Sequence, residues 1–291
     1  MNTLQKVILG LASAALITTA QAEDLDITHA VAADATVTVI NVAGEIGVST
    51  WDREEVRLTG HTGANAELHV TENSQGIQFE VRQLRNRSRS DESVLELVVP
   101  AGASIVAEGV SADITIEGSR GAQIRAESVS GDVTVRAEVG RVDLSTVSGD
   151  IEFSGSASRS SAETVSGDIE LRGISGEATI KSVSGDALAE TGTLTIGKLE
   201  SVSGSLELIT EVEAGGRLTI ENMSGDVSLA LPDAQSGEFR AQSFSGGIRT
   251  QFGRVERAEH GPGSYLKHIE GDSGTLIRVE SFSGDVHINR R

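Results

Sequence analysis

SVSGDVTV, residues Ser128–Val135, is the stretch that this chain repeats from its middle to its end. The pattern returns in copies whose central glycines are Gly131, Gly149, Gly167, Gly185, Gly204, Gly225, Gly246 and Gly284. Successive glycines are 18, 18, 18, 19, 21, 21 and 38 residues apart. A period of roughly 20 residues is typical of a stacked-repeat protein.

Each repeat predicts a tight turn followed by a short strand. Gly supplies backbone angles that other residues avoid, and Ser and Asp bond neighbouring backbone groups. In Asp132–Val135 and Asp168–Leu171 apolar and polar residues then alternate, which is the period of a half-buried strand. A weaker glycine signal lies 9 residues before the next motif glycine and predicts two short strands and two turns per coil: Gly140, Gly176, Gly216 and Gly237.

A single strand of this kind cannot bury its apolar face, so we expect the coils to stack in parallel. Stacking would form one internal ladder from Val133, Ile151, Ile169 and Ala187, and a second internal ladder from Val129, Val147, Val165 and Val183. Each buried aliphatic side chain contributes about 1.5–3 kcal/mol. The expected fold is all-β, a parallel β-solenoid of 18–21 residues per coil, right-handed by the usual rule for parallel connections. An aromatic content of only 3% suits such a narrow core.

The first 22 residues have the features of a secretory signal peptide. Lys6 supplies the charge, Val7–Ile17 the apolar segment, and Ala20-Gln21-Ala22 the cleavage site. The chain has no cysteine, which excludes disulfides and a lipid-modified cysteine. We therefore expect an exported protein, periplasmic or extracellular, with no transmembrane segment. Its formal net charge of −19 disfavours nucleic acid and anionic lipid as partners.

Three regions are expected: the signal peptide at residues 1–22, irregular β coils or a β cap at residues 23–102, and the solenoid at residues 103–291. A cap is needed because the first coil would otherwise expose an unpaired strand edge. Its expected strands are Thr36–Ile40, Ile46–Thr50, Val56–Leu58, Glu67–Val70, Ile77–Val81 and Val94–Val99. The 38-residue gap between Gly246 and Gly284 is interpreted as two coils, with a degenerate turn at Ser273–Leu276.

Three motifs frame the repeats: VAGEI at residues 42–46, VPAG at 99–102 and SFSGDV at 281–286. With them, the chain resembles the bacterial DUF4097 group, known as "putative adhesins" or β-strand repeat-containing proteins, and the related head-GIN-domain autotransporter adhesins. The resemblance covers almost the whole chain after the signal peptide. It implies an exported, β-helix-like protein, and it supplies no catalytic residues to carry over.

A row of aspartates is the sharpest candidate for a ligand site. One turn position in four successive coils is occupied by Asp132, Asp150, Asp168 and Asp186. The carboxylates could hold a cation, most simply Ca²⁺, between them. Alternatively each Asp bonds its own turn and faces water, and this second interpretation is favoured because Ser205 and Gly247 replace Asp in later coils. The repeats also lack the G-G-x-G-x-D glycines of calcium-binding β-rolls.

Other polar residues are weaker candidates. The repeat serines are equivalent and lack a paired base, so turn packing explains them better than nucleophilic catalysis does. Trp51 is expected to cap the first coil rather than to stack on a sugar. The histidines lack metal-ligand spacing, although His268 and His287 could stack in adjacent coils. One loop is basic, and it either binds an anionic glycan or is simply solvated. Its arginines are Arg82, Arg85, Arg87 and Arg89.

Together these features predict a non-enzymatic structural or interaction protein of the cell envelope, with an adhesin-like role implied by the resemblance alone. A glycan-active β-helix enzyme is one alternative, and it would need a cleft with converging acids and bases. A Ca²⁺-binding repeat protein is another. No catalytic or cofactor-binding residue is assigned and no cofactor is expected. The partner, protein or glycan, and the oligomeric state are left open.

Overall fold

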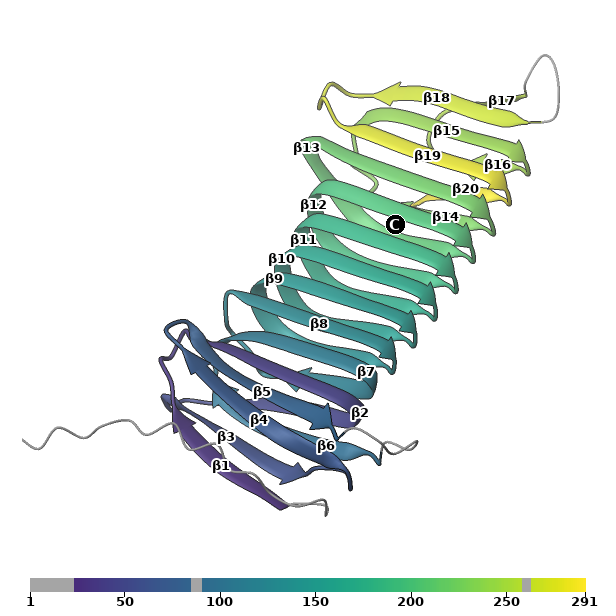
Figure 1. Cartoon of the computed structure of the whole chain (residues 1–291). Helices are drawn as coiled ribbons and strands as arrows, with labels where there is room; N and C mark the ends of the chain where they lie inside the picture. Colours follow the sequence, from purple (N-terminus) through teal and green to yellow (C-terminus); the bar gives the residue numbers. More distant parts are fainter. Residues whose placement is uncertain (1–23, 85–90, 258–262) are drawn as a thin grey trace, which may run out of the picture.

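The computed structural model describes residues 24–84, 91–257 and 263–291, and every regular element in these ranges is a β-strand. The strands wind into a single rod in which most neighbours run parallel (Figure 1). The expected parallel β-solenoid is thus confirmed. The described part of the chain offers no helix with the length and hydropathy to span a bilayer.

The middle of the rod consists of regular rungs, each built from one long bent strand: β9 (Val133–Ser148), β10 (Ile151–Ser166), β11 (Ile169–Ser184), β12 (Ala187–Ser203) and β13 (Leu206–Ser224). The expectation of two strands and two turns per coil is therefore wrong. At the halfway glycine Gly176, whose φ is +77°, the strand bends through local register shifts, but it continues through the bend. Only the turn at the motif glycine separates each of these strands from the next.

The first predicted internal ladder is confirmed. Ile151 lies in register with Val133 below it and with Ile169 above it, and Ala187 follows on the next rung. All four side chains are at most 2% exposed. They belong to one continuous apolar core that runs the length of the rod.

The second predicted ladder is wrong, because Val129, Val147, Val165 and Val183 lie on the outside of the rod and are 44–47% exposed. The inward position belongs to the residue just before each valine. Ser128, for example, is buried and donates from Oγ to the carbonyl oxygen of Ala112 at 2.9 Å. Thr146 also bonds the turn of the neighbouring rung, from Oγ1 to the carbonyl oxygen of Gly131. Since the residue before each valine points inward, strand alternation turns the valine outward.

At the N-terminal end, rungs stack out of sequence order. β2 (Thr36–Trp51) lies between a rung made of β5 (Gly76–Gln83) and β6 (Ser93–Pro100) and a rung made of β7 (Ser104–Glu117). β8 (Gln123–Ser130) then leads into the regular rungs. The six strands expected here are all found, although the first two form the single strand β2.

Antiparallel strands cover this end. β1 (Asp24–Ala30) pairs with β3 (Glu55–His61), β3 pairs with β6, and β4 (Ala66–Asn73) pairs with β5. Since these strands run against the direction of the rungs, the parallel stack does not continue beyond them.

The C-terminal end repeats this arrangement. After β14 (Val227–Leu231), the chain forms β15 (Gly237–Ser245) and β16 (Ile248–Thr250), and then the antiparallel strands β17 (Val255–Arg257) and β18 (Ser264–Glu270). It returns through β19 (Leu276–Ser283) and β20 (Val286–Arg290).

This returning rung inserts between earlier ones. β19 pairs with β13 on one side and with β15 on the other, while β20 pairs with β14 and β16 (Figure 1). The interpretation of the 38-residue gap as two successive coils is therefore wrong. The gap holds a capping hairpin and a strand that turns back into the stack.

Candidate interaction surface

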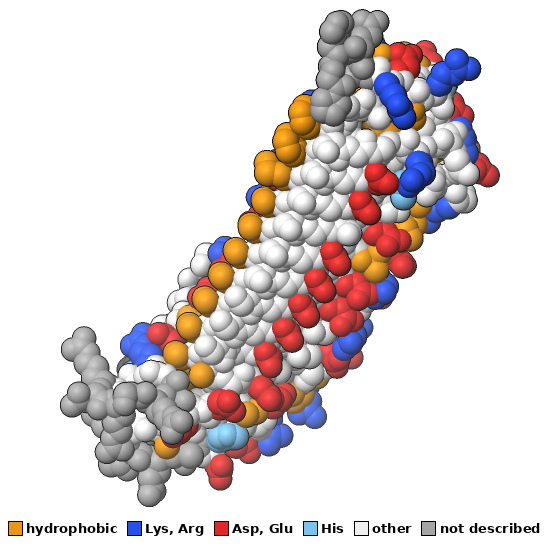
Figure 2. Space-filling view, turned by 90° about the vertical axis from the view of Figure 1, so that its right-hand side faces the viewer, with side chains coloured by type: hydrophobic (Ala, Val, Ile, Leu, Met, Phe, Trp, Pro, Cys, Tyr) orange, Lys and Arg blue, Asp and Glu red, His pale blue; other side chains and the backbone are white. Residues whose placement is uncertain are grey.

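An exposed apolar stripe runs along one edge of the rod, with one side chain from each successive rung next to the Ser-Gly-Asp turn (Figure 2). Its residues are 44–58% exposed and are, in spatial order, Val110, Val129, Val147, Val165, Val183, Val202, Met223, Phe282 and Phe244. At about 4.8 Å per rung, the stripe is about 38 Å long. A monomeric protein rarely leaves so long an apolar feature uncovered, which makes the stripe a candidate interaction surface.

The side chains of the stripe become larger toward its C-terminal end. Valine gives way to Met223 and then to Phe282 and Phe244, whose rings stack with centroids 5.0 Å apart and planes 8° from parallel. Both rings are about half exposed. Aromatic side chains of this kind dominate the energetics of protein interfaces, so this end provides the strongest anchor.

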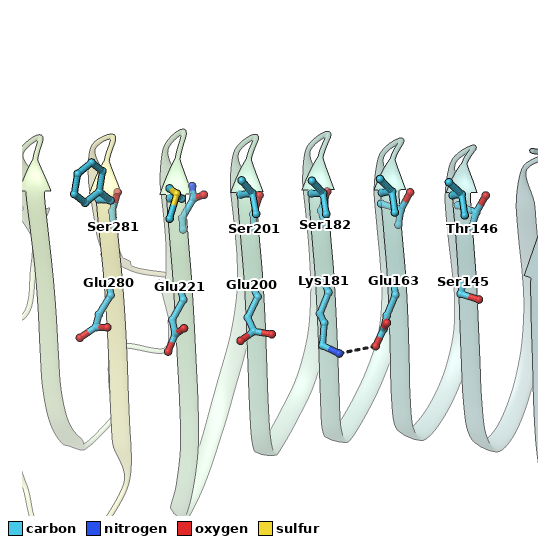
Figure 3. A pocket seen from close by; sticks show the side chains of 18 of the residues that line it. Ser145, Thr146, Glu163, Lys181, Ser182, Glu200, Ser201, Glu221, Glu280 and Ser281 are labelled. Atoms are coloured by element: carbon cyan, nitrogen blue, oxygen red, sulfur yellow. Dashed lines mark hydrogen bonds and ion pairs between the residues drawn. The ribbon is translucent and has the colours of Figure 1, made fainter. Parts of the chain in front are cut away.

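A row of mostly charged side chains lies beside the stripe, two positions earlier on the strands, with Ser145 as an uncharged member (Figure 3). In Figure 3 they point the same way from neighbouring strands: Glu163, Lys181, Glu200, Glu221 and Glu280. Between this row and the stripe lies a shallow trough of about 890 Å³ with buried hydroxyls at its floor.

The charged row is acidic but largely paired. Lys181 Nζ lies 2.8 Å from Glu163, and this hydrogen bond raises the pKa of Lys181. Glu200 is bridged by Lys198 at 2.7 Å. We refer to this row as the Glu row. It borders the stripe with four carboxylates and one ammonium group, and the ion pairs reduce its negative charge without cancelling it.

On the other side of the stripe lie the repeat serines, which are all exposed, followed by the aspartates. The backbone N–H of Asp150 donates to Oδ1 of Asp132 at 2.9 Å, and the same bond joins Asp168 to Asp150 and Asp186 to Asp168, each at 2.8 Å. Each carboxylate thus bonds the turn of the next rung rather than its own turn. In the described ranges, no group of three or more His, Cys, Asp or Glu is placed to hold a metal ion.

The repeat glycines lie where two turns approach most closely. A Cβ on Gly167 would lie 2.0 Å from the carbonyl oxygen of Gly149, and the φ of Gly167 is +150°. Both the contact and the backbone angle require glycine. The turns therefore set the position of the valine that precedes them on every rung.

The remaining candidates from the sequence are scattered. Arg82 pairs with Glu80 at 2.7 Å. Trp51 ends β2, donates from Nε1 to the carbonyl oxygen of Glu55 at 2.7 Å and carries Arg53 over its ring. The candidates that fall outside the described residues are Arg85, Arg87, Arg89 and His260.

The histidines are likewise separate from one another. His268 lies on β18, 3.6 Å from Glu270, whereas His287 lies on β20 beside Arg249. The two rings do not stack, so the idea of a shared histidine pair is wrong. His29 and His69 each contact a glutamate on the N-terminal strands.

Shifted pKa values in the described residues all favour the charged form. The Arg57 guanidinium lowers the pKa of Asp26, the Arg159 guanidinium lowers that of Glu177, and the Gly247 N–H lowers that of Asp285. A general acid or base needs the opposite, a pKa moved toward neutrality.

Sequence reasoning missed the stripe, although a signal was present. Counting alternation backward from Val133 crosses the turn, where the alternation is interrupted. Counting forward from buried Ala126 places Ser128 inward and Val129 outward. A hydroxyl or Asn residue precedes the apolar residue in eight rungs, which marks the inward position: Ser128, Thr146, Thr164, Ser182, Ser201, Asn222, Ser243 and Ser281.

Comparison with known proteins gives one family match. The family model described as "Toastrack DUF4097" matches residues 22–289. Among curated proteins no sequence matches the chain.

Several crystal structures are similar in outline. A "putative adhesin" of Bacteroides fragilis is 10% identical, with a TM-score of 0.46, covering 92% of this chain and 97% of its own. A "putative adhesin" of Parabacteroides merdae is 14% identical, with a TM-score of 0.38 and coverage of 92% and 96%. A "putative cell adhesion protein" of Clostridium sporogenes is 8% identical, with a TM-score of 0.27 and coverage of 92% and 100%. At these values the likeness carries no argument about binding.

Proposed function

Because the chain belongs to the Toastrack DUF4097 family, we propose that it is an exported, non-enzymatic interaction protein of the cell envelope. The observation that carries the proposal is the continuous apolar stripe from Val110 to Phe244. A rigid rod that presents one apolar side chain per rung offers a long and regular contact surface. An adhesin-like role is the finer form of the same proposal.

Export rests on the sequence of residues 1–22, which has the charge, apolar segment and small-residue cleavage site of a signal peptide. The sequence has no cysteine, which excludes a lipid-modified cysteine and a disulfide. We expect the exported protein to begin at Glu23. N-terminal sequencing of protein recovered from the periplasm or medium tests this, and an intact Met1 would contradict it.

Interaction at the envelope is tested by cell fractionation. We expect part of the exported protein to remain with the envelope after osmotic shock, and we expect Val165→Glu to release it because a charge then interrupts the stripe. Thr179→Glu, on the neighbouring strand β11 and outside the stripe, is the control. Equal retention of both variants would contradict the assignment of the stripe.

The alternative of a glycan-active enzyme receives no specific support from the described residues. It requires converging acid and base groups in a cleft, whereas the trough beside the stripe is lined by paired charges, valines and hydroxyls. The Ca²⁺ alternative rests on Asp132, Asp150, Asp168 and Asp186, whose Oδ1 atoms each accept a backbone N–H. Calorimetry with Ca²⁺ tests that alternative directly.

A further inference from the structure

We propose that the apolar stripe is the contact between two copies of this chain that lie side by side with their rods parallel. The inference rests on the proposed function in one respect, that the stripe is an interaction surface. It adds the identity of the partner and the direction in which the partner runs.

The spacing of the stripe fits a second copy better than any other regular segment. Its side chains repeat at the rung spacing of about 4.8 Å, and a second β-solenoid has the same repeat. A helix repeats every 5.4 Å, so along eight rung spacings it would drift by about 5 Å, a full rung. An extended strand repeats on one face at roughly 6.6–6.8 Å and drifts faster. Only a second stack of rungs keeps every valine in an equivalent contact.

The exposed apolar area of the stripe is large enough for a dimer interface. Nine apolar side chains that are about half exposed offer on the order of 700 Å² per copy, close to the share of one partner in a standard interface. The stacked pair Phe244 and Phe282 gives this area an aromatic anchor at one end. A two-fold axis along the stripe places each ring against its twin.

The charges beside the stripe select the direction. The Glu row lies on one side of the stripe and the exposed serines on the other. A two-fold axis along the stripe makes the rods parallel and sets the Glu row of each copy opposite the serine hydroxyls of its partner. A two-fold axis across the stripe makes the rods antiparallel and sets the Glu rows of the two copies opposite one another. Only the parallel arrangement avoids direct repulsion between like charges.

The net charge predicts how dimerisation depends on the salt concentration. Each chain carries a formal charge of −19, so two parallel rods repel one another at long range. Because the Debye length falls from about 30 Å at 0.01 M salt to about 8 Å at 0.15 M, dimerisation should strengthen with salt. Binding of a basic partner to the same acidic surroundings would weaken with salt.

The test uses the purified exported protein in analytical ultracentrifugation. We expect a dimer whose dissociation constant falls by about tenfold between 0.01 M and 0.15 M salt. We expect Val165→Glu to give a monomer and Thr179→Glu to give wild-type association, with unchanged circular dichroism for both because Val165 lies on the surface. A monomer at both salt concentrations would overturn the proposal, as would a dimer that Val165→Glu leaves intact.

Cross-linking tests the direction of the partner, because the chain has no cysteine of its own. We expect Val129→Cys, near one end of the stripe, to form an intermolecular disulfide. In an antiparallel pair its counterpart would lie at the far end, and only the central substitution Val183→Cys would cross-link. Cross-linking of Val183→Cys alone would overturn the parallel arrangement. A monomer whose envelope retention is lost in Val165→Glu would keep the proposed function and exclude the second copy as partner.

Discussion

The backbone N–H of Asp168 donates to Oδ1 of Asp150, one rung earlier, at 2.8 Å. The same bond joins Ser205 to Asp186 at 2.7 Å, and it joins Asp285 to Asp226 at 2.8 Å although these two are far apart in sequence. The motif aspartate therefore links two neighbouring rungs by a hydrogen bond. Its carboxylate satisfies a turn N–H that has no strand partner.

This role predicts the effect of removing one of these hydrogen bonds. Asp150→Ala leaves the N–H of Asp168 to water, and we expect the free energy of unfolding to fall by about 0.5–1.5 kcal/mol. Asp150→Asn retains an Oδ1 acceptor and removes one of several like charges in the row, so we expect no loss. Urea unfolding followed by circular dichroism compares the two variants. Equal destabilisation by both would assign the effect to charge rather than to the hydrogen bond.

The glycines of the motif predict a larger effect. In Gly167→Ala the new Cβ would meet the carbonyl oxygen of Gly149 at 2.0 Å, so the two rungs must separate. We expect a loss of about 3 kcal/mol or more, because backbone strain adds to the clash. Gly215→Ala is the control, since its φ is +79° but nothing lies within 4 Å, and we expect only about 1–2 kcal/mol. Thermal unfolding of both variants measures the difference.

The regular rungs could be predicted from the sequence because their information is local. Gly131 and Gly149 mark each turn, and the alternation after Val133 and Ile151 marks the inward face. The exposed stripe was missed because Val129 and Val133 lie on opposite sides of a turn, and alternation does not carry across it. A count from the preceding strand gives the correct face.

The order in which strands stack at the two ends could not be predicted, because it depends on pairings between distant segments. Nothing in the sequence of Leu276–Ser283 indicates that it pairs with β13 and β15 at once. Its copy of the motif suits any rung. The preceding hairpin decides the order. Its strand β18 pairs antiparallel with β15, and the chain then turns back so that β19 can insert between β13 and β15.

The insertion predicts the result of a C-terminal truncation. Removing residues 276–291 deletes an interior rung, so β15 and β16 lose their partners β19 and β20. We expect amide protection to be lost in β15, β16 and β18 and to be retained in β9 and β10, because stability in a stack is local. Hydrogen exchange with mass spectrometry measures both regions. Retained protection in β15 would mean that this strand stacks directly on β13, contrary to the prediction.

The C-terminal cap should be sensitive to acid. The Arg290 guanidinium lowers the pKa of Glu270 below its usual value of 4.5. Since the folded pKa is lowered, this pair stabilises the cap fully above pH 4.5 and progressively less as the pH falls through the folded pKa. We expect Glu270→Gln to lower the midpoint of thermal unfolding at pH 6 and to have little effect at a pH below the folded pKa of Glu270. Tyr265 on β18, the only tyrosine, reports this region by fluorescence in a Trp51→Phe background. An equal effect of the variant at both pH values would exclude the ion pair as the cause.

The buried hydroxyl row under the trough contains one position that a mutation should improve. Thr164 is 4% exposed, and its Oγ1 has no hydrogen-bond partner in the described residues, whereas Oγ1 of Thr146 donates to the carbonyl oxygen of Gly131 at 3.3 Å. A buried hydroxyl without a partner keeps its desolvation cost and gains nothing in return. We expect Thr164→Val, which preserves the shape, to raise the free energy of unfolding by about 1 kcal/mol. Thr146→Val is the matched control and should lower it or leave it unchanged. Urea unfolding of the two variants decides the point, and a loss of stability in Thr164→Val would show that this hydroxyl is bonded in solution.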